Sequence, residues 1–260
     1  MRKILKYSFF DLIRSRWSYV YFIFYLGSTW SLLYLGNDVS KAIVSLLNII
    51  LIISPLIGML FGSMYFYNSR EFAELLLSQP IKRSAVFLGQ YLGLSLALSI
   101  SFVLGMGIPF TIYGLFGSAE IWNFSVLLLV GVALTFIFTG FAFWISLANE
   151  NKIKGFGLAI LVWLTMAVVY DGIFLLLLLA FEAYPIEKLA VSLTVFNPID
   201  LSRILVMLKL DISALMGYTG AVYNKFFGTA TGMVVSMTSL FLWVAIPILG
   251  MLHKANKKDF

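Results

Sequence analysis

Six apolar runs, each long enough to cross a bilayer, follow one another along this chain of 260 residues. A helix rises 1.5 Å per residue, so about 20 apolar residues cover the ~30 Å of hydrocarbon in a membrane. The runs predict transmembrane helices at 17–36, 43–67, 85–113, 123–148, 156–181 and 228–252. Because 61% of the residues are hydrophobic and only 12% are charged, the chain has too little polar surface for a soluble domain. We therefore predict an all-α polytopic membrane protein, with residues 1–260 forming a single transmembrane domain.

The basic residues predict which loops face the cytoplasm. Both termini and the loops on their side hold thirteen Lys and Arg, whereas the opposite set of loops holds five. Cytoplasmic loops carry this excess in multi-pass proteins. The bias places both termini in the cytoplasm together with residues 69–83. It also accounts for the net charge of +6, so we expect no nucleic-acid partner.

Residues 1–16 have the pattern of a helix that lies in the membrane interface. Apolar residues such as Ile4 and Leu12 recur on one face, with Lys3, Lys6 and Arg14 on the other. A basic tail that simply flanks the first span is the alternative interpretation.

The sequence lacks the motifs of an enzyme. It contains no cysteine and a single histidine, His253, which excludes thiolate metal sites and cysteine nucleophiles. The patterns HExxH, GxSxG and GxxxxGK[ST] are missing. We therefore expect a protein that is not an enzyme and binds no cofactor or metal itself. Any ATP-driven activity, with its Mg²⁺, must belong to a partner.

Asp171 is the one acidic residue within a predicted span. A charged side chain at the centre of a membrane helix costs about 2.5–3.5 kcal/mol on insertion scales, so such a residue is a candidate functional site. The alternative is an acid that packs helices together through a neighbouring hydroxyl or faces a water-filled cleft.

The segment SREFAELLLSQPIKRS, residues 69–84, is amphipathic and lies between two spans. Its pattern predicts a short helix with two faces: an apolar one of Phe72, Leu75, Leu76 and Leu77, and a charged one of Arg70, Glu71 and Glu74. Ser69 is the expected N-cap, and Pro80 is expected to end the helix. A rigid helix held by spans at both ends suits a push from a cytoplasmic protein. A free-standing interfacial helix is the alternative.

The external segment 182–227 contains the pattern of two short helices. Asn197 is a candidate N-cap, Pro198 suits the first helical position, and Asp200 and Arg203 are spaced to pair. Asp211 is the expected cap of the second helix. We expect a partly buried or re-entrant hairpin, with a simple loop packed on the bundle as the alternative.

An interfacial N-terminal helix, six spans, a cytoplasmic helix between spans two and three and a helical segment before span six resemble the ABC-2 type permeases. Two stretches sharpen this resemblance, LLLSQPIKRSAVFLGQYLGLSLALS (75–99) and NPIDLSRILVMLKLDISALMGYTGAVY (197–223). Both are similar to those of NosY-type permeases, the membrane subunits of the ABC transporter needed for copper-site maturation of nitrous oxide reductase.

The resemblance implies a homodimer in the bacterial inner membrane, a cytoplasmic NosF-like ATPase that holds ATP and Mg²⁺, and a periplasmic NosD-like β-helical copper-handling protein. It places the coupling interface with the ATPase at Arg70, Glu71, Glu74, Leu75, Gln79 and Arg83. It places the region near the periplasmic partner at Asn197, Asp200, Arg203, Asp211 and Tyr218. Movement of residues 69–83 would drive transport or change the periplasmic partner. A generic ABC-2 exporter of lipid, drug or peptide and an ion-coupled secondary transporter that uses Asp171 are the rival functions.

Overall fold

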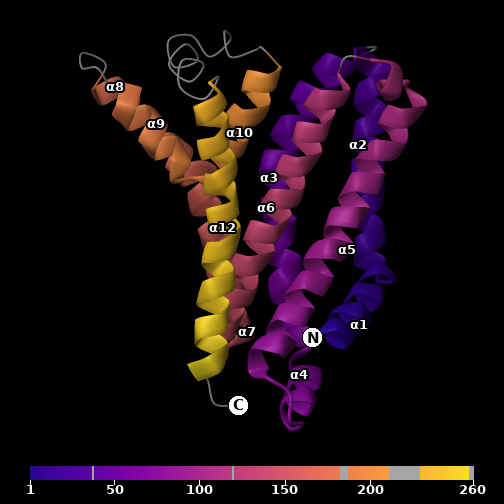
Figure 1. Ribbon diagram of the computed structural model, residues 1–260, viewed down its shortest axis with the longest axis vertical. Coiled ribbons are helices and arrows are strands. Elements are labelled where there is room, and N and C mark those ends of the chain that lie inside the picture. Colours follow the sequence, from indigo (N-terminus) through magenta and orange to yellow (C-terminus); the bar gives the residue numbers. More distant parts are fainter. Residues whose placement is uncertain (37, 119, 182–186, 211–228, 258–260) are drawn as a thin grey trace.

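The structure, a computed structural model, describes all residues except 37, 119, 182–186, 211–228 and 258–260. Every regular element in this part is a helix (Figure 1). The helices are α1 (Arg2–Ile13), α2 (Arg16–Gly36), α3 (Val39–Asn68), α4 (Arg70–Leu77), α5 (Arg83–Ile112), α6 (Ile121–Ala148), α7 (Lys152–Leu164), α8 (Tyr170–Ala180), α9 (Glu187–Val195), α10 (Pro198–Lys209) and α12 (Ala230–Lys257). A 3₁₀ turn at Leu115–Gly117 precedes α6, and a π-helical segment at Thr165–Val169 joins α7 to α8.

Five helices in the described part are long and apolar enough to cross a membrane. They are α3, α5, α6, the continuous α7–α8 helix and α12, and they correspond to the second to sixth predicted spans. The first predicted span is also a helix, the 21-residue α2, which packs against α5 and α3. Tyrosine, tryptophan, serine and threonine interrupt its apolar residues. These residues lower the mean hydropathy of α2, which is not among the five helices. Its membrane crossing therefore stays a prediction.

Small residues let the helices at the centre of the bundle approach closely. Gly58 and Gly62 of α3 face α6, and a Cβ atom added at Gly62 would lie 2.5 Å from the Cβ of Ala142. On the other side of the bundle, a Cβ added at Gly93 of α5 would lie 2.6 Å from the Cβ of Ser8 in α1. Small residues at such crossings are how membrane helices gain van der Waals contact in the absence of a hydrophobic driving force. The first sixteen residues thus contain a helix, α1, that is packed on α5.

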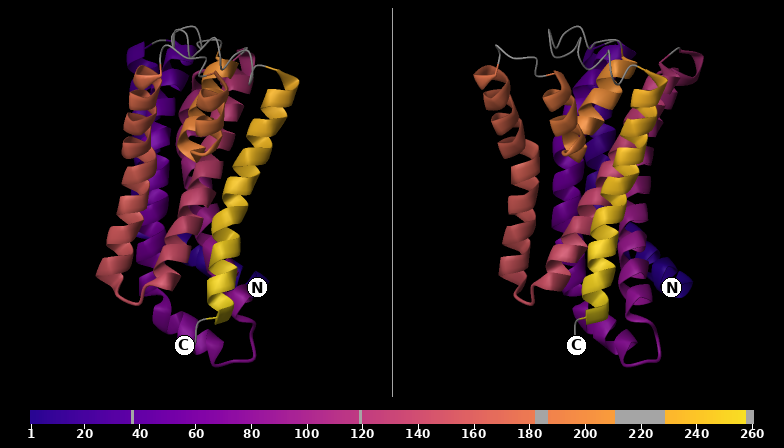
Figure 2. Two further views of the ribbon diagram at one scale, coloured as in Figure 1. Left: turned by 90° about the vertical axis from the view of Figure 1, so that its left-hand side faces the viewer. Right: turned by 60° about the vertical axis from the view of Figure 1, so that its left-hand side comes forward.

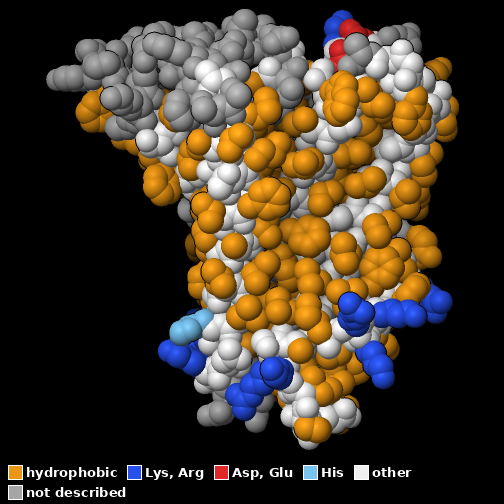
Figure 3. Space-filling view, viewed as in Figure 1, with side chains coloured by type: hydrophobic (Ala, Val, Ile, Leu, Met, Phe, Trp, Pro, Cys, Tyr) orange, Lys and Arg blue, Asp and Glu red, His pale blue; other side chains and the backbone are white. Residues whose placement is uncertain are grey.

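The N-terminus, the end of α12 and α4 lie at the same end of the bundle. Figure 1 shows the N-terminus, α4 and the end of α12 together at the bottom, with the start of α3 and the end of α10 at the top. In Figure 3, Lys and Arg side chains gather near the bottom, where the continuous apolar surface ends. The grouping expected from the basic residues is therefore present, while the assignment of this end to the cytoplasm stays a prediction.

The helices α9 and α10 form a hairpin in the upper half of the bundle, between α7–α8 and α12 (Figure 2). Its tip points toward the middle of the molecule (Figure 2), where Asn197 and Ile199 are buried while Phe196 is exposed. The start of α10 agrees with the sequence prediction, since Asn197 is the N-cap and Pro198 occupies the first turn. The helix α9 was not predicted. The second helix expected from Asp211, together with Tyr218, falls outside the described residues.

Candidate functional site

The short helix α4 connects the long helices α3 and α5 and packs against both. Ser69 joins it directly to α3, and the Nε2 of Gln90 in α5 donates a hydrogen bond to the Ser69 Oγ at 3.3 Å. Ala73 is buried against the bundle. The ring of Phe72 stacks on Tyr7 of α1, with ring centroids 4.9 Å apart. The helix α4 is therefore in contact with α1, α3 and α5 together.

The opposite face of α4 is open. Glu71, Glu74, Leu75 and Ser78 are exposed, and their spacing of three and four residues puts them on one face of the helix. Leu75 is 68% exposed and lies between the two carboxylates of this face. Arg70 borders this face and pairs with Glu74 at 2.9 Å. The face thus combines acidic groups with one apolar side chain.

Two details of the predicted helix are corrected. Leu75 was expected on the same face as Phe72, but it points away from the bundle, and Ala73 takes the buried position. Ser69 stands at the N-cap position, yet its side chain does not cap the helix. Its hydroxyl donates back to the carbonyl of Phe66 in α3 at 3.4 Å. The helix ends at Leu77, three residues before Pro80, as the proline rule indicates.

A second candidate site lies where α8 meets the α9–α10 hairpin. The guanidinium of Arg203 in α10 donates to Asp171 of α8 at 2.9 Å and to Asp200 at 3.1 Å. Asp200 also accepts from the Asn197 amide at 3.1 Å and is 7% exposed. We call Asp171, Asn197, Asp200 and Arg203 the hairpin cluster. It gives Asp171, the acid within the fifth predicted span, a charged partner.

Burial, with Asp171 alongside, raises the pKa of Asp200 in α10 to about 8, against the opposing effect of Arg203. Burial thus favours the protonated, uncharged form of the Asp200 carboxyl. An uncharged Asp200 brings the hairpin cluster closer to electrical neutrality, because the guanidinium of Arg203 then faces fewer negative charges. Neutrality is what a partly desolvated group of charges requires.

The π-helical segment of the fifth span provides a further attachment for the hairpin. The amide of Asn197 donates to the carbonyl of Met166 at 2.8 Å. Next to this segment, the hydroxyl of Tyr170 donates to the carbonyl of Leu193 at 2.5 Å. Such π segments shift the register of a helix and recur at functional sites. Here the segment brings a backbone acceptor to the tip of the hairpin.

These polar contacts matter because α7–α8 has few neighbours of its own. None of its most apolar 18-residue window is buried within the chain, compared with 50% for α3, 61% for α5 and 67% for α6. In both views of Figure 2, α7–α8 stands at the side of the bundle, next to the hairpin. The hairpin cluster therefore ties a peripheral span to the body of the protein.

The remaining predicted residues lie in two places. Gln79 is exposed in the turn after α4, and Arg83 begins α5 at the same end. Asn197 and Asp200 were expected near a periplasmic partner, but their side chains are buried and serve contacts within the chain. The role of this segment in binding a partner stays a prediction. Within the described residues, no group of three or more His, Asp or Glu side chains is arranged to hold a metal ion.

Comparison with known proteins identifies two relatives, although no protein-family model matches the chain. The probable ABC transporter permease protein NosY of Stutzerimonas stutzeri is 26% identical over 215 residues, which is 75% of this chain and 76% of the relative. This chain is similar to NosY permeases. The protein of the same name from Pseudomonas aeruginosa is 24% identical over 217 residues, covering 81% of this chain and 76% of the relative.

The two NosY relatives confirm the prediction of a NosY-like ABC transporter permease, a multi-pass membrane component that implies an ATPase elsewhere in its transporter. In this NosY-like chain, sequence reasoning missed the pairing of Asp171 with Arg203, which are 32 positions apart. One signal was available. A lone acid in an apolar span is costly to leave unpaired, so a basic residue of the segment that follows the span, such as Arg203, was a candidate partner.

Proposed function

We propose that this chain is the membrane subunit of an ABC transporter needed for copper-site maturation of nitrous oxide reductase. In this proposal two copies form a homodimer in the bacterial inner membrane, with a NosF-like ATPase on the cytoplasmic side and a NosD-like protein on the periplasmic side. The similarity to NosY permeases supports the assignment. The alternative within the same class is a permease that exports lipid, drug or peptide.

The open face of α4 is the observation that carries the proposal. It lies at the end of the bundle that holds the N-terminus and the end of α12, and it presents Glu71, Glu74 and Leu75 away from the protein. A rigid helix with acidic groups around an apolar centre suits a groove lined by basic and apolar side chains. We place the ATPase in that position, with Arg70, Gln79 and Arg83 at the edges of the contact.

Movement of the ATPase on binding and hydrolysing ATP would displace α4 and the three helices attached to it. The helices α3 and α5 each run 30 residues toward the opposite end. There, α3 packs against α10. The hairpin cluster would pass the movement on to α8. The displacement would either carry a solute through the homodimer or change the shape of the surface that the NosD-like protein contacts.

Reversing the charges of α4 tests the proposal. The double variant Glu71→Lys, Glu74→Lys should retain at least tenfold less ATPase during purification in mild detergent, because two attractive contacts become repulsive, a loss of about 1.4 kcal/mol or more. The chain itself should stay folded, since the Arg70–Glu74 pair is exposed on both sides and contributes only about 0.3–0.5 kcal/mol. The copper content of nitrous oxide reductase in the same cells should fall in parallel.

The variant Lys41→Glu is the matched control, because Lys41 is a highly exposed residue at the opposite end of the bundle. It should retain the ATPase. Unchanged ATPase binding by the double variant would refute the coupling role of α4. Loss of the ATPase with normal copper content in the reductase would refute the maturation role and favour a generic exporter.

A further inference from the structure

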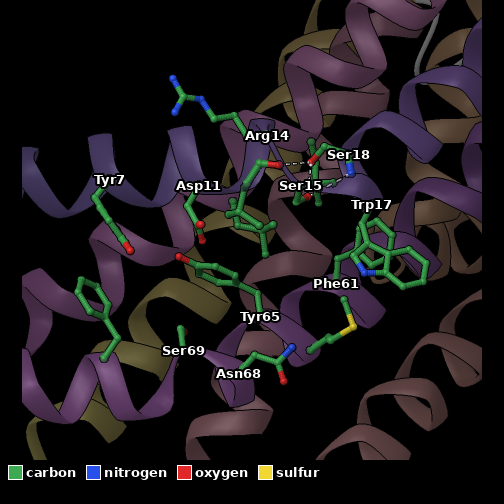
Figure 4. Close-up of a pocket in the computed structure, with 15 residues that line it drawn as sticks. Tyr7, Asp11, Arg14, Ser15, Trp17, Ser18, Phe61, Tyr65, Asn68 and Ser69 are labelled. Carbon is green, nitrogen blue, oxygen red and sulfur yellow. Dashed lines mark hydrogen bonds between the residues drawn. The ribbon is translucent and has the colours of Figure 1, made fainter.

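A hollow of about 590 Å³ lies between α1, the start of α2, the end of α3 and α4 (Figure 4). Its lining divides into two zones. One zone is apolar and includes Trp17 and Phe61, whose rings are 5.8 Å apart, with Leu94 and Leu98 of α5. The other zone is polar and includes Tyr7, Asp11, Tyr65 and Asn68. The volume is in the range of sites that hold small molecules, and the lining suits an amphipathic one.

The polar zone contains a carboxylate that forms no ion pair. Among the residues that the structure describes, Asp11 is exposed at the mouth of the hollow and has no cation within 4 Å, although Arg14 also borders the hollow. Figure 4 shows its side chain extending from α1 toward the hydroxyl of Tyr65, with Tyr7 on the same side of the helix. Carboxylate and phenol oxygens accept hydrogen bonds from an ammonium group, and the phenol rings attract it electrostatically. This zone therefore suits a positively charged group.

Basic groups surround the opening of the hollow. Arg14 lies one helical turn after Asp11, and Figure 4 shows its side chain pointing out of the hollow. A second depression of about 510 Å³ on the outer side of α1 shares Tyr7, Asp11 and Arg14 and adds Lys3 and Lys6. Cationic side chains at a membrane surface attract the phosphate of a lipid headgroup. An anion thus suits the rim, within one helical turn of the cation expected inside.

From this arrangement we infer that the hollow binds a phospholipid with an ethanolamine headgroup. In that headgroup, two carbon atoms separate a primary ammonium group from the phosphate. The ammonium group would pair with Asp11, and the phosphate would contact Arg14 and Lys6. One acyl chain would lie along Trp17 and Phe61. A lipid with choline has no N–H group to donate to Asp11, and a lipid with glycerol has no cation to pair with it. The inference does not depend on the transporter assignment.

The test compares lipids of identical acyl chains on the purified, delipidated full-length chain by native mass spectrometry. Phosphatidylethanolamine should stay bound at detergent concentrations that remove phosphatidylcholine and phosphatidylglycerol. The variant Asp11→Asn should bind phosphatidylethanolamine about tenfold more weakly and lose its preference over phosphatidylcholine. The variant Arg14→Gln should weaken all three lipids. Lys41→Gln, at the other end of the bundle, should behave like the unchanged protein.

Two results would overturn the inference. Equal retention of phosphatidylethanolamine and phosphatidylcholine by the unchanged protein would show that the ammonium group is not recognised. Preferred binding of phosphatidylglycerol that Asp11→Asn leaves intact would assign the lipid to the basic rim alone. The comparison of lipids on the unchanged chain needs no variant, so it holds even if a substitution impairs folding.

Discussion

Replacing Arg203 by methionine is expected to lower the free energy of unfolding by about 2–3 kcal/mol. The substitution keeps the apolar part of the side chain but removes both hydrogen bonds of the guanidinium, to Asp171 at 2.9 Å and to Asp200 at 3.1 Å. Asp171 is left as a carboxylate in an apolar span without its partner. The expected loss is below the roughly 3–5 kcal/mol of a fully buried pair, because the side chains of Arg203 and Asp171 are 28% and 30% exposed.

A double-variant cycle separates this effect from lost packing. In the background of Arg203→Met, the further change Asp171→Asn should restore part of the stability, because it removes the unpaired charge. The control Lys41→Met removes an exposed pair with a distance of 3.9 Å and should change the stability by less than about 0.5 kcal/mol. Unfolding in mixed detergent micelles measures the unchanged protein, Arg203→Met, Asp171→Asn, their combination and the control Lys41→Met. Equal stability of Arg203→Met and Lys41→Met would contradict the role of the hairpin cluster.

The hairpin cluster illustrates which features of the structure the sequence predicts and which it does not. Local patterns were sufficient for the long apolar helices, for α4 with its stop before Pro80, and for the Asn197 cap of α10. Each depends on residues within a few positions of one another. The pairing of Asp171 with Arg203 joins two elements 32 positions apart, a separation that no helical period encodes, so local patterns alone do not identify the partner of Asp171.

The helix α9 was also not predicted from local patterns, because it depends on contacts with distant residues. A helix of nine residues is marginal on its own, because forming its first turn costs more than its few hydrogen bonds return. It is held by contacts from elsewhere: Tyr170 donates to the Leu193 carbonyl, and the indole of Trp243 in α12 donates to the Val195 carbonyl at 3.0 Å. The outward orientation of Leu75, which was expected on the same face as Phe72, also depends on packing against other helices. The space beneath α4 accepts the small Ala73, which periodicity alone does not single out.

Replacing Gly62 by leucine is expected to destabilise the chain by about 3 kcal/mol, at the upper end of the usual range for overpacking. Even the first added atom would lie 2.5 Å from the Cβ of Ala142 and 3.4 Å from the Thr139 carbonyl oxygen. Neither of these atoms belongs to the end of a flexible side chain. The helices α3 and α6 must therefore move apart, which weakens the most extensive helix packing in the bundle.

The matched control is Gly107→Leu in α5, where an added Cβ would have no neighbour within 4 Å. This variant should stay within about 0.5 kcal/mol of the unchanged protein, since it meets open space. Because α3 continues into α4 through Ser69, the Gly62 variant should also bind the ATPase less well, whereas the Gly107 variant should not. Equal stability of the two leucine variants would show that the α3–α6 crossing relaxes freely. In that case α3 would not be the rigid connection that the coupling mechanism needs.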